Sequence, residues 1–145
     1  MAAIPLLLIT IIFFHVSFTY IDLALFIAEL VIGFMIANLI GFLIGTLAIF
    51  ITEVYGLAAV VWSIMFLLGG GVVPLSFLPG RISYILYLLP FQNMGYLPTA
   101  TLLGLATSTE IVKGTVVGIA WITGLFILSY FWWKRVNKYI TSVGG

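Results

Sequence analysis

The sequence predicts an all-α integral membrane protein with four transmembrane helices and an outer hairpin of short helices. Three observations predict this fold class. Of the 145 residues, 64% are hydrophobic and only 6% are charged, whereas about 25% are charged in a typical soluble domain. Four apolar stretches are long enough to cross a hydrocarbon core of ~30 Å, which takes about 20 helical residues. Four of the five prolines fall within residues 74–110, where no apolar stretch is long enough to cross.

The composition also excludes several functional classes. Five basic and four acidic residues cannot cover the surface of a soluble domain, and the net charge of +1 provides no basic patch for nucleic acid. Without cysteine, the chain forms no disulfide, thiolate metal site or cysteine nucleophile. It contains no phosphate-binding loop, HExxH motif or GxSxG motif. We therefore expect no catalytic, cofactor-binding or metal-binding residues, and a membrane role rather than an enzyme.

The apolar stretches predict a single transmembrane domain over residues 1–145. The spans are expected at about residues 3–20, 23–51, 55–73 and 111–133. The first has no basic segment before it and no small-residue cleavage pattern after it, so we interpret it as a retained helix rather than a signal peptide. Because the number of spans is even, both ends of the chain are expected on one side of the membrane.

The charges after the last span predict which side that is. Lys134, Arg135 and Lys138 lie in a tail at residues 134–145, directly after a cluster of tyrosine and tryptophan side chains. Lys and Arg near the ends of spans favour the cytoplasm, and aromatic side chains favour the membrane interface. We therefore expect both termini in the cytoplasm.

The proline-rich segment at residues 74–110 is predicted to form two short helices that dip into the outer leaflet or lie on it. Proline ends or kinks a helix, and a broken backbone cannot face lipid because its polar groups would go unpaired. The segment should therefore pack against the spans or line a cavity, and a plain hydrophobic loop is the alternative. Its candidate gate residues are Pro90, Gln92, Asn93, Tyr96 and Pro98. For the polar residues among them, ordinary solvation at the membrane interface is the alternative role.

Three polar side chains lie within the predicted spans. An ionisable residue inside a membrane is a functional-site hypothesis by default, but Glu29 could also sit at the outer interface near Asp22, in contact with water. Asn38 needs hydrogen-bond partners in a medium without water, so we expect it to bond across a helix interface. His15 is expected to be a hydrogen-bonded packing residue, with a proton relay as the alternative.

Small residues recur at spacings that bring membrane helices together. They allow close approach of backbones, either within one chain or between subunits, and the sequence leaves both possibilities open. The candidate packing or dimer residues are Gly33, Ala37, Gly41, Gly45, Gly114 and Gly118.

Three separate motifs resemble the ABC type-2 exporter permeases, and in particular the branch known as ABC-2 family transporter proteins. The run VVPLSFLPGRISYILYLLPFQNMGYLPTATLLG at residues 72–104 is similar to the outer hairpin of that family. FITEVYGL at residues 50–57 resembles its inner turn, and WWKRVNKYITSVGG at residues 132–145 resembles its basic tail. The motifs occur in the family's order, and the resemblance as a whole extends over essentially the entire chain.

The resemblance implies an assembly in which two permeases pair and two ATPase subunits, with ATP and Mg, power export. The four spans would be equivalent to the last four of a six-span permease, and the hairpin would gate the outer end of the pathway. The first two spans and the main coupling segment would belong to a longer chain or to a separate one. The candidate cytoplasmic coupling residues are Glu53, Lys134, Arg135 and Lys138, although a solvated turn charge or a salt bridge to the basic tail is the simpler role of Glu53.

We therefore expect the permease subunit of an ATP-binding cassette exporter in a bacterial inner membrane, with a lipid-like, drug-like or amphipathic substrate. Its partners would be the ATPase subunits, a second permease and the lipid bilayer. Two alternatives stay open. One is a proton-coupled small multidrug transporter that uses Glu29. The other is a structural subunit of a membrane complex that transports nothing.

Overall fold

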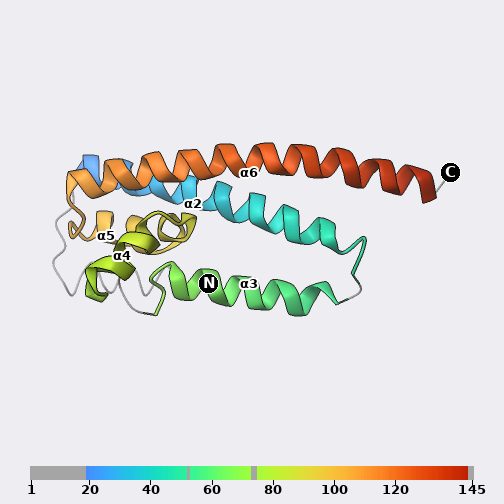
Figure 1. Ribbon diagram of the computed structural model, residues 1–145. Helices are drawn as coiled ribbons and strands as arrows, with labels where there is room; N and C mark the ends of the chain where they lie inside the picture. Colours follow the sequence, from blue (N-terminus) through green and yellow to red (C-terminus); the bar gives the residue numbers. More distant parts are fainter. Residues whose placement is uncertain (1–18, 52, 73–74, 144–145) are drawn as a thin grey trace, which may run out of the picture.

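The computed structural model describes residues 19–51, 53–72 and 75–143 (Figure 1). The described residues form helices and no strand, which confirms the all-α prediction. The predicted span at residues 3–20, with His15, lies outside the described residues except for its last two positions. Within the described ranges, two helices are long and apolar enough to cross a membrane.

Helix α2 (Tyr20–Leu47) is the first of these two helices. Its 28 residues extend over about 42 Å at 1.5 Å per residue. Its start is defined by Thr19, whose backbone N–H donates to Asp22 Oδ2 over 3.0 Å and so satisfies a donor that the helix leaves unpaired. The observed helix begins three residues earlier and ends four residues earlier than the predicted span at 23–51.

Helix α3 (Val54–Leu68) is shorter than the predicted span at 55–73. Its 15 residues cover only about 22 Å, which is less than the hydrocarbon core. The helix ends at three consecutive glycines, and Gly70 has a φ of 83°, a left-handed conformation that glycine adopts without strain. The glycines therefore end the helix at Leu68, five residues before the predicted end of this span.

Helix α6 (Ser108–Val143) extends beyond the predicted span at 111–133 into the predicted tail at residues 134–145. Its 36 residues extend over about 54 Å, and the helix continues without interruption through the basic residues up to Val143. The positive charges mark a change of polarity, but no glycine or proline lies between them and Val143 to end the helix. A capping pair starts it, because Thr107 N–H donates to Glu110 Oε2 over 2.8 Å.

The segment predicted to be the outer hairpin contains, in its described residues, four short helices rather than two. These are η1 (Leu75–Phe77), α4 (Gly80–Tyr87), η2 (Pro90–Met94) and α5 (Tyr96–Leu102). Prolines lie at the beginnings of α4, η2 and α5, where a missing N–H costs no helical hydrogen bond. The prolines thus start new helices in addition to interrupting old ones.

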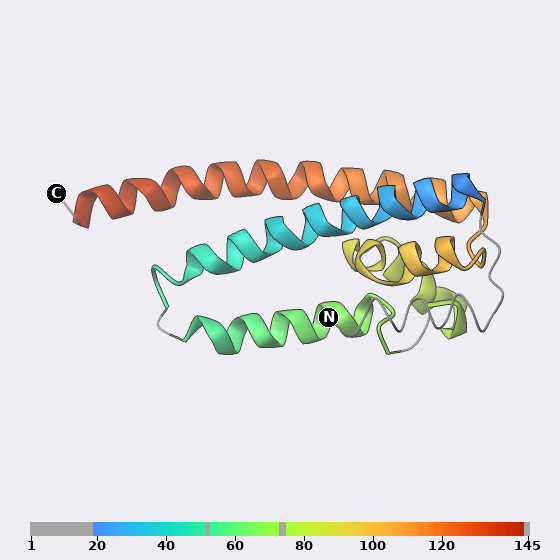
Figure 2. The ribbon, with the colours of Figure 1, turned by 180° about the vertical axis from the view of Figure 1, so that it is seen from behind.

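The helices form two layers, and the hairpin fills one end. Helices α2 and α6 run side by side, α3 lies along the far side of α2, and the short helices sit beyond the end of α3 against the α2–α6 pair (Figures 1 and 2). A small core joins α2 to α6 through Ile32, Ile36 and Leu125. The elements therefore converge at the hairpin end.

Aromatic side chains join α2 to α6 at the opposite end. Trp132 Nε1 donates to Thr46 Oγ1 over 2.8 Å, and the ring of Phe50 lies edge-on to Trp132 at 6.2 Å between centroids. Trp133 stacks at a tilt on Phe42, 5.8 Å away. This end of the helix pair is thus held by indole contacts.

Replacing Trp132 by phenylalanine is expected to lower the free energy of unfolding by about 1 kcal/mol, the usual net contribution of one hydrogen bond. The matched control is Trp133→Phe, which makes the same loss of ring size at a tryptophan that packs on the ring of Phe42. Denaturant unfolding of the purified variants in detergent measures both. Equal losses in the two variants would show that the bond to Thr46 contributes nothing.

Candidate functional site

The polar centre of the molecule lies where η2 inserts between α2 and α6. Asn93 and Gln92 of η2 are 0% and 2% exposed. The first half of α5 is buried with them, and Leu97 is 0% exposed. The expectation of interfacial solvation is therefore wrong for Gln92 and Asn93, because the surrounding helices cover both side chains.

Glycines on the two long helices create the space for η2. A Cβ atom on Gly33 would lie 3.0 Å from the carbonyl carbon of Asn93 and closer still to its oxygen. A Cβ atom on Gly118 would lie 2.8 Å from Asn93 Nδ2, and one on Gly114 would overlap the side chain of Leu97. Such distances are shorter than real Cβ contacts allow. These three glycines therefore serve packing within the chain.

Glu29, Asn93 and Thr115 form a buried polar cluster from three elements, which we call the Glu29 cluster. Asn93 Nδ2 donates to Glu29 Oε2 and to the carbonyl oxygen of Gly114, both over 3.0 Å. Thr115 Oγ1 is hydrogen-bonded to Glu29 Oε1. Glu29 is 1% exposed, so the alternative in which it meets water at the outer interface is wrong. The hydrogen bonds tie α2, η2 and α6 together.

Sequence reasoning missed Thr115 and misjudged Asn38. Thr115 directly follows Gly114 on the face that meets the hairpin, and that adjacency was the only available signal. Asn38 is exposed and donates to the carbonyl oxygen of Phe34 in its own helix over 2.8 Å, so its bond among the described residues lies within α2 rather than across a helix interface. The side-chain amide of an asparagine in a helix can donate to a backbone carbonyl oxygen of the preceding turn, and Asn38 makes such a local bond.

Hydrogen bonds within the hairpin hold its other polar residues. Gln92 Nε2 donates to the carbonyl oxygen of Tyr87 over 2.5 Å, and Tyr87 OH donates to Tyr96 OH over 3.3 Å. Desolvation by burial, together with the bond to Tyr96, raises the pKa of the Tyr87 phenol well above its ordinary value. The phenol of Tyr87 therefore stays neutral at any physiological pH.

The remaining small residues do not serve packing within the described chain in the same way. A Cβ atom on Gly45 would meet nothing within 4 Å, and one on Gly41 would touch only the Trp62 ring at 3.9 Å. Gly41 and Gly45 line an open apolar cavity between α2 and α3, and Ala37 lines a neighbouring one. The small residues thus divide into a packed set near the hairpin and an open set near the inner turn.

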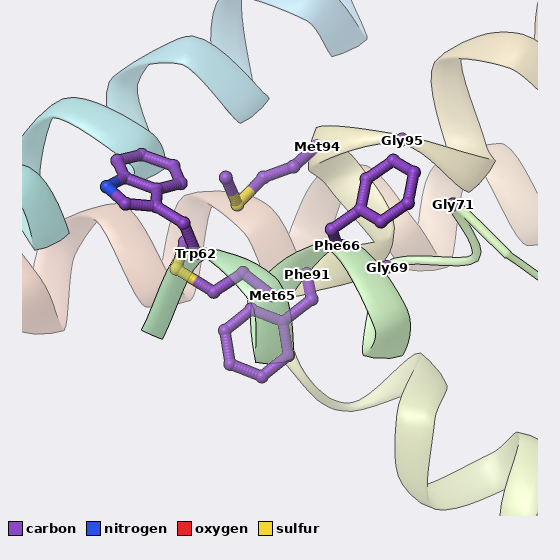
Figure 3. Close-up of a pocket in the computed structure, with 8 residues that line it drawn as sticks. All are labelled: Trp62, Met65, Phe66, Gly69, Gly71, Phe91, Met94 and Gly95. Atoms are coloured by element: carbon purple, nitrogen blue, oxygen red, sulfur yellow. The ribbon is translucent and has the colours of Figure 1, made fainter. Parts of the chain in front are cut away.

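A third apolar cavity, of about 190 Å³, lies between the end of α3 and η2 (Figure 3). Its walls are aromatic rings, methionine side chains and glycine backbone, and Trp62 lines this cavity as well as the two between α2 and α3. The lining residues of this third cavity are Trp62, Met65, Phe66, Gly69, Gly71, Phe91, Met94 and Gly95. Within the described part of the chain, no group of three or more His, Asp or Glu side chains could hold a metal ion.

The candidate coupling residues lie at the end of the molecule opposite the hairpin. Glu53 is exposed at the start of α3, in the turn that follows α2. Lys134, Arg135 and Lys138 are exposed on α6, which extends past that turn (Figure 2). Lys134 Nζ sits 4.5 Å from the centre of the Tyr130 ring, a cation–π contact. The four candidate coupling residues therefore lie together at the end of the molecule opposite the hairpin.

Comparison with known proteins is consistent with this arrangement. The profile of a family described as ABC-2 family transporter protein matches residues 1–144. No curated protein and no solved structure matches the chain. The match covers nearly the whole chain, and both membrane-length helices fall within it. The chain is therefore an integral membrane protein that belongs to the ABC-2 transporter family.

Proposed function

We propose that this chain is a permease subunit of an ATP-binding cassette exporter. It would form the translocation pathway with a second permease, identical or related, and separate ATPase subunits would supply the energy. The observation that carries the proposal is the family match over residues 1–144. The sequence supports a separate ATPase, because it contains no phosphate-binding loop of its own.

The outer hairpin is the proposed gate of the pathway. Two features support this role. The hairpin is built of short helices joined by tight turns, and its η2 helix is inserted between two long helices that could move as rigid bodies. Packed helix interfaces switch between discrete arrangements, so a small movement at one end can open the other. The Glu29 cluster and the Tyr87–Tyr96 contact would keep the gate closed.

The two buried prolines give a test of the gate. Pro90 begins η2 and Pro98 lies in the first turn of α5, with Gly95 between the two helices. Alanine in place of Pro98 permits a longer, stiffer helix, so we expect export to fall several-fold while assembly is retained. Uptake of substrate into inverted vesicles measures export, and gel filtration measures assembly. Pro79→Ala is the matched control, because Pro79 is exposed before α4. Normal export by both variants would show that the hairpin does not gate the pathway.

The proposed orientation places the basic end of α6 in the cytoplasm, where an ATPase would dock. The exposed side chains of Lys134, Arg135, Lys138 and Glu53 are the charged groups described at that end. Bacterial inner membranes carry an excess of Lys and Arg on the cytoplasmic side of spans, which supports this placement. A lipid-like or amphipathic substrate is supported by the apolar walls of the cavities that Trp62 lines.

The burial of Glu29 favours a second candidate function, proton-coupled transport of a cationic substrate. In that mechanism the carboxyl group must gain and lose a proton in each cycle. Glu29→Gln would then abolish transport. In the exporter mechanism the carboxyl group only bonds neighbouring helices, so transport by Glu29→Gln stays close to that of the native chain.

A further inference from the structure

The hydroxyl group of Thr115 makes two hydrogen bonds but has only one proton. Thr115 Oγ1 lies 2.8 Å from the carbonyl oxygen of Ile111, one helical turn earlier. It is also hydrogen-bonded to Glu29 Oε1. A carbonyl oxygen and an ionised carboxylate oxygen are both acceptors only. Both contacts are full hydrogen bonds only if one of them receives its proton from another group.

The hydroxyl proton of Thr115 is expected in the bond to the carbonyl oxygen of Ile111. Other hydroxyl side chains in the helices make the same bond to the carbonyl oxygen four residues earlier, at 2.8 or 2.9 Å. They are Ser63, Thr99, Thr101 and Thr123. If Thr115 follows this pattern, its proton points at Ile111 and its lone pairs face Glu29. The proton between Thr115 and Glu29 must then belong to the carboxyl group.

The surroundings of Glu29 also disfavour a negative charge. Its side chain is 1% exposed, and among the described residues it makes no ion pair with Lys or Arg. Lys113 is two residues from Thr115 but about 200° around the helix, and it is exposed. Asp22 lies about two turns earlier on α2 and bonds to Thr19. A buried carboxylate without a cation is costly, whereas a neutral carboxylic acid needs only hydrogen-bond partners.

We propose that Glu29 binds a proton and works as a neutral hydrogen-bonding group. Its carboxyl O–H donates to Thr115 Oγ1, which in turn donates to the carbonyl oxygen of Ile111. Its other oxygen accepts from Asn93 Nδ2. Every hydrogen in the chain of bonds then has one donor and one acceptor. The proton is thus a structural ligand that fastens α2, η2 and α6, and the site requires neither a metal ion nor a substrate.

Infrared spectroscopy tests the proton directly. A neutral carboxylic acid has a carbonyl absorption separate from that of a carboxylate. The chain has only four acidic side chains, Asp22, Glu29, Glu53 and Glu110. We expect the purified protein at neutral pH to show the neutral-acid band, Glu53→Gln to keep it and Glu29→Gln to lose it. Absence of the band, or its survival in Glu29→Gln, would overturn the proposal.

Thermal unfolding of the same preparations tests the hydrogen bonds. Glutamine places an N–H donor and a carbonyl acceptor where the neutral acid has its O–H and C=O groups, so Glu29→Gln should melt within a few degrees of the native chain. Thr115→Val should melt lower than Thr123→Val, because Thr123 is exposed and bonds only to its own helix. A large loss in Glu29→Gln would show that the negative charge is required, against the proposal. Neither readout depends on transport, so a failure of the exporter role leaves both interpretable.

Discussion

Replacing Asn93 by alanine is expected to lower the free energy of unfolding by about 3 kcal/mol and to loosen the outer hairpin. The side-chain amide of Asn93 donates to Glu29 Oε2 and to the carbonyl oxygen of Gly114, and the residue is fully buried. Without it, two buried acceptors lose a donor that water cannot replace. Denaturant unfolding in detergent measures the stability. Hydrogen exchange of the amides in residues 90–102 measures the hairpin.

Asn38→Ala is the matched control for this prediction. Asn38 is an asparagine in α2 that is exposed and donates only to Phe34 of its own helix. We expect a change within about 0.5 kcal/mol, because surface substitutions away from buried networks usually have such small effects. If Asn38→Ala and Asn93→Ala lose equal stability, the Glu29 cluster does not fasten the hairpin.

Replacing Gly33 by alanine is the second change with a large expected effect. The new methyl group would meet the backbone carbonyl of Asn93, which cannot rotate away as a flexible side chain could. Either α2 or η2 must move, and the Glu29 cluster between them must stretch. We expect a loss of about 2 kcal/mol, typical of an overpacked core. Faster hydrogen exchange in residues 90–94, observed in the same variant, would locate the displacement at η2.

Gly45→Ala provides the opposite expectation on the same helix. A Cβ atom there would meet nothing within 4 Å, and alanine is favoured over glycine inside a helix by up to about 1 kcal/mol. The variant should therefore be as stable as the native chain or more stable. If the effects of Gly33→Ala and Gly45→Ala were reversed, Gly33 could not be the residue that admits η2.

The sequence was informative about composition and chain interruption, because these are local properties. Apolar runs predicted the long helices, and the prolines correctly placed a broken segment between α3 and α6. Helix α6 continues ten residues past 133, where the predicted span ends. A change from apolar to basic residues marks where a helix meets polar surroundings, but it does not interrupt the helical backbone.

The pairing of side chains could not be predicted, because it depends on contacts between distant segments. Glu29 and Asn93 are 64 positions apart, and each was a candidate for its own reason, with nothing in the sequence to join them. Gly33 and Gly41 lie in one ridge of small residues, yet only Gly33 faces η2. Their difference comes from where the hairpin packs, which no single-helix pattern contains.

The measurement that tests the central claim most directly is purification of the native complex in mild detergent. The chain would carry a tag at its C-terminus, and mass spectrometry would identify every protein that accompanies it. The account predicts a soluble ATPase subunit with a phosphate-binding loop, in fixed ratio to the permease, and ATP hydrolysis by the purified complex. Recovery of the chain alone or with integral membrane subunits only, in a preparation that hydrolyses no ATP, would contradict it.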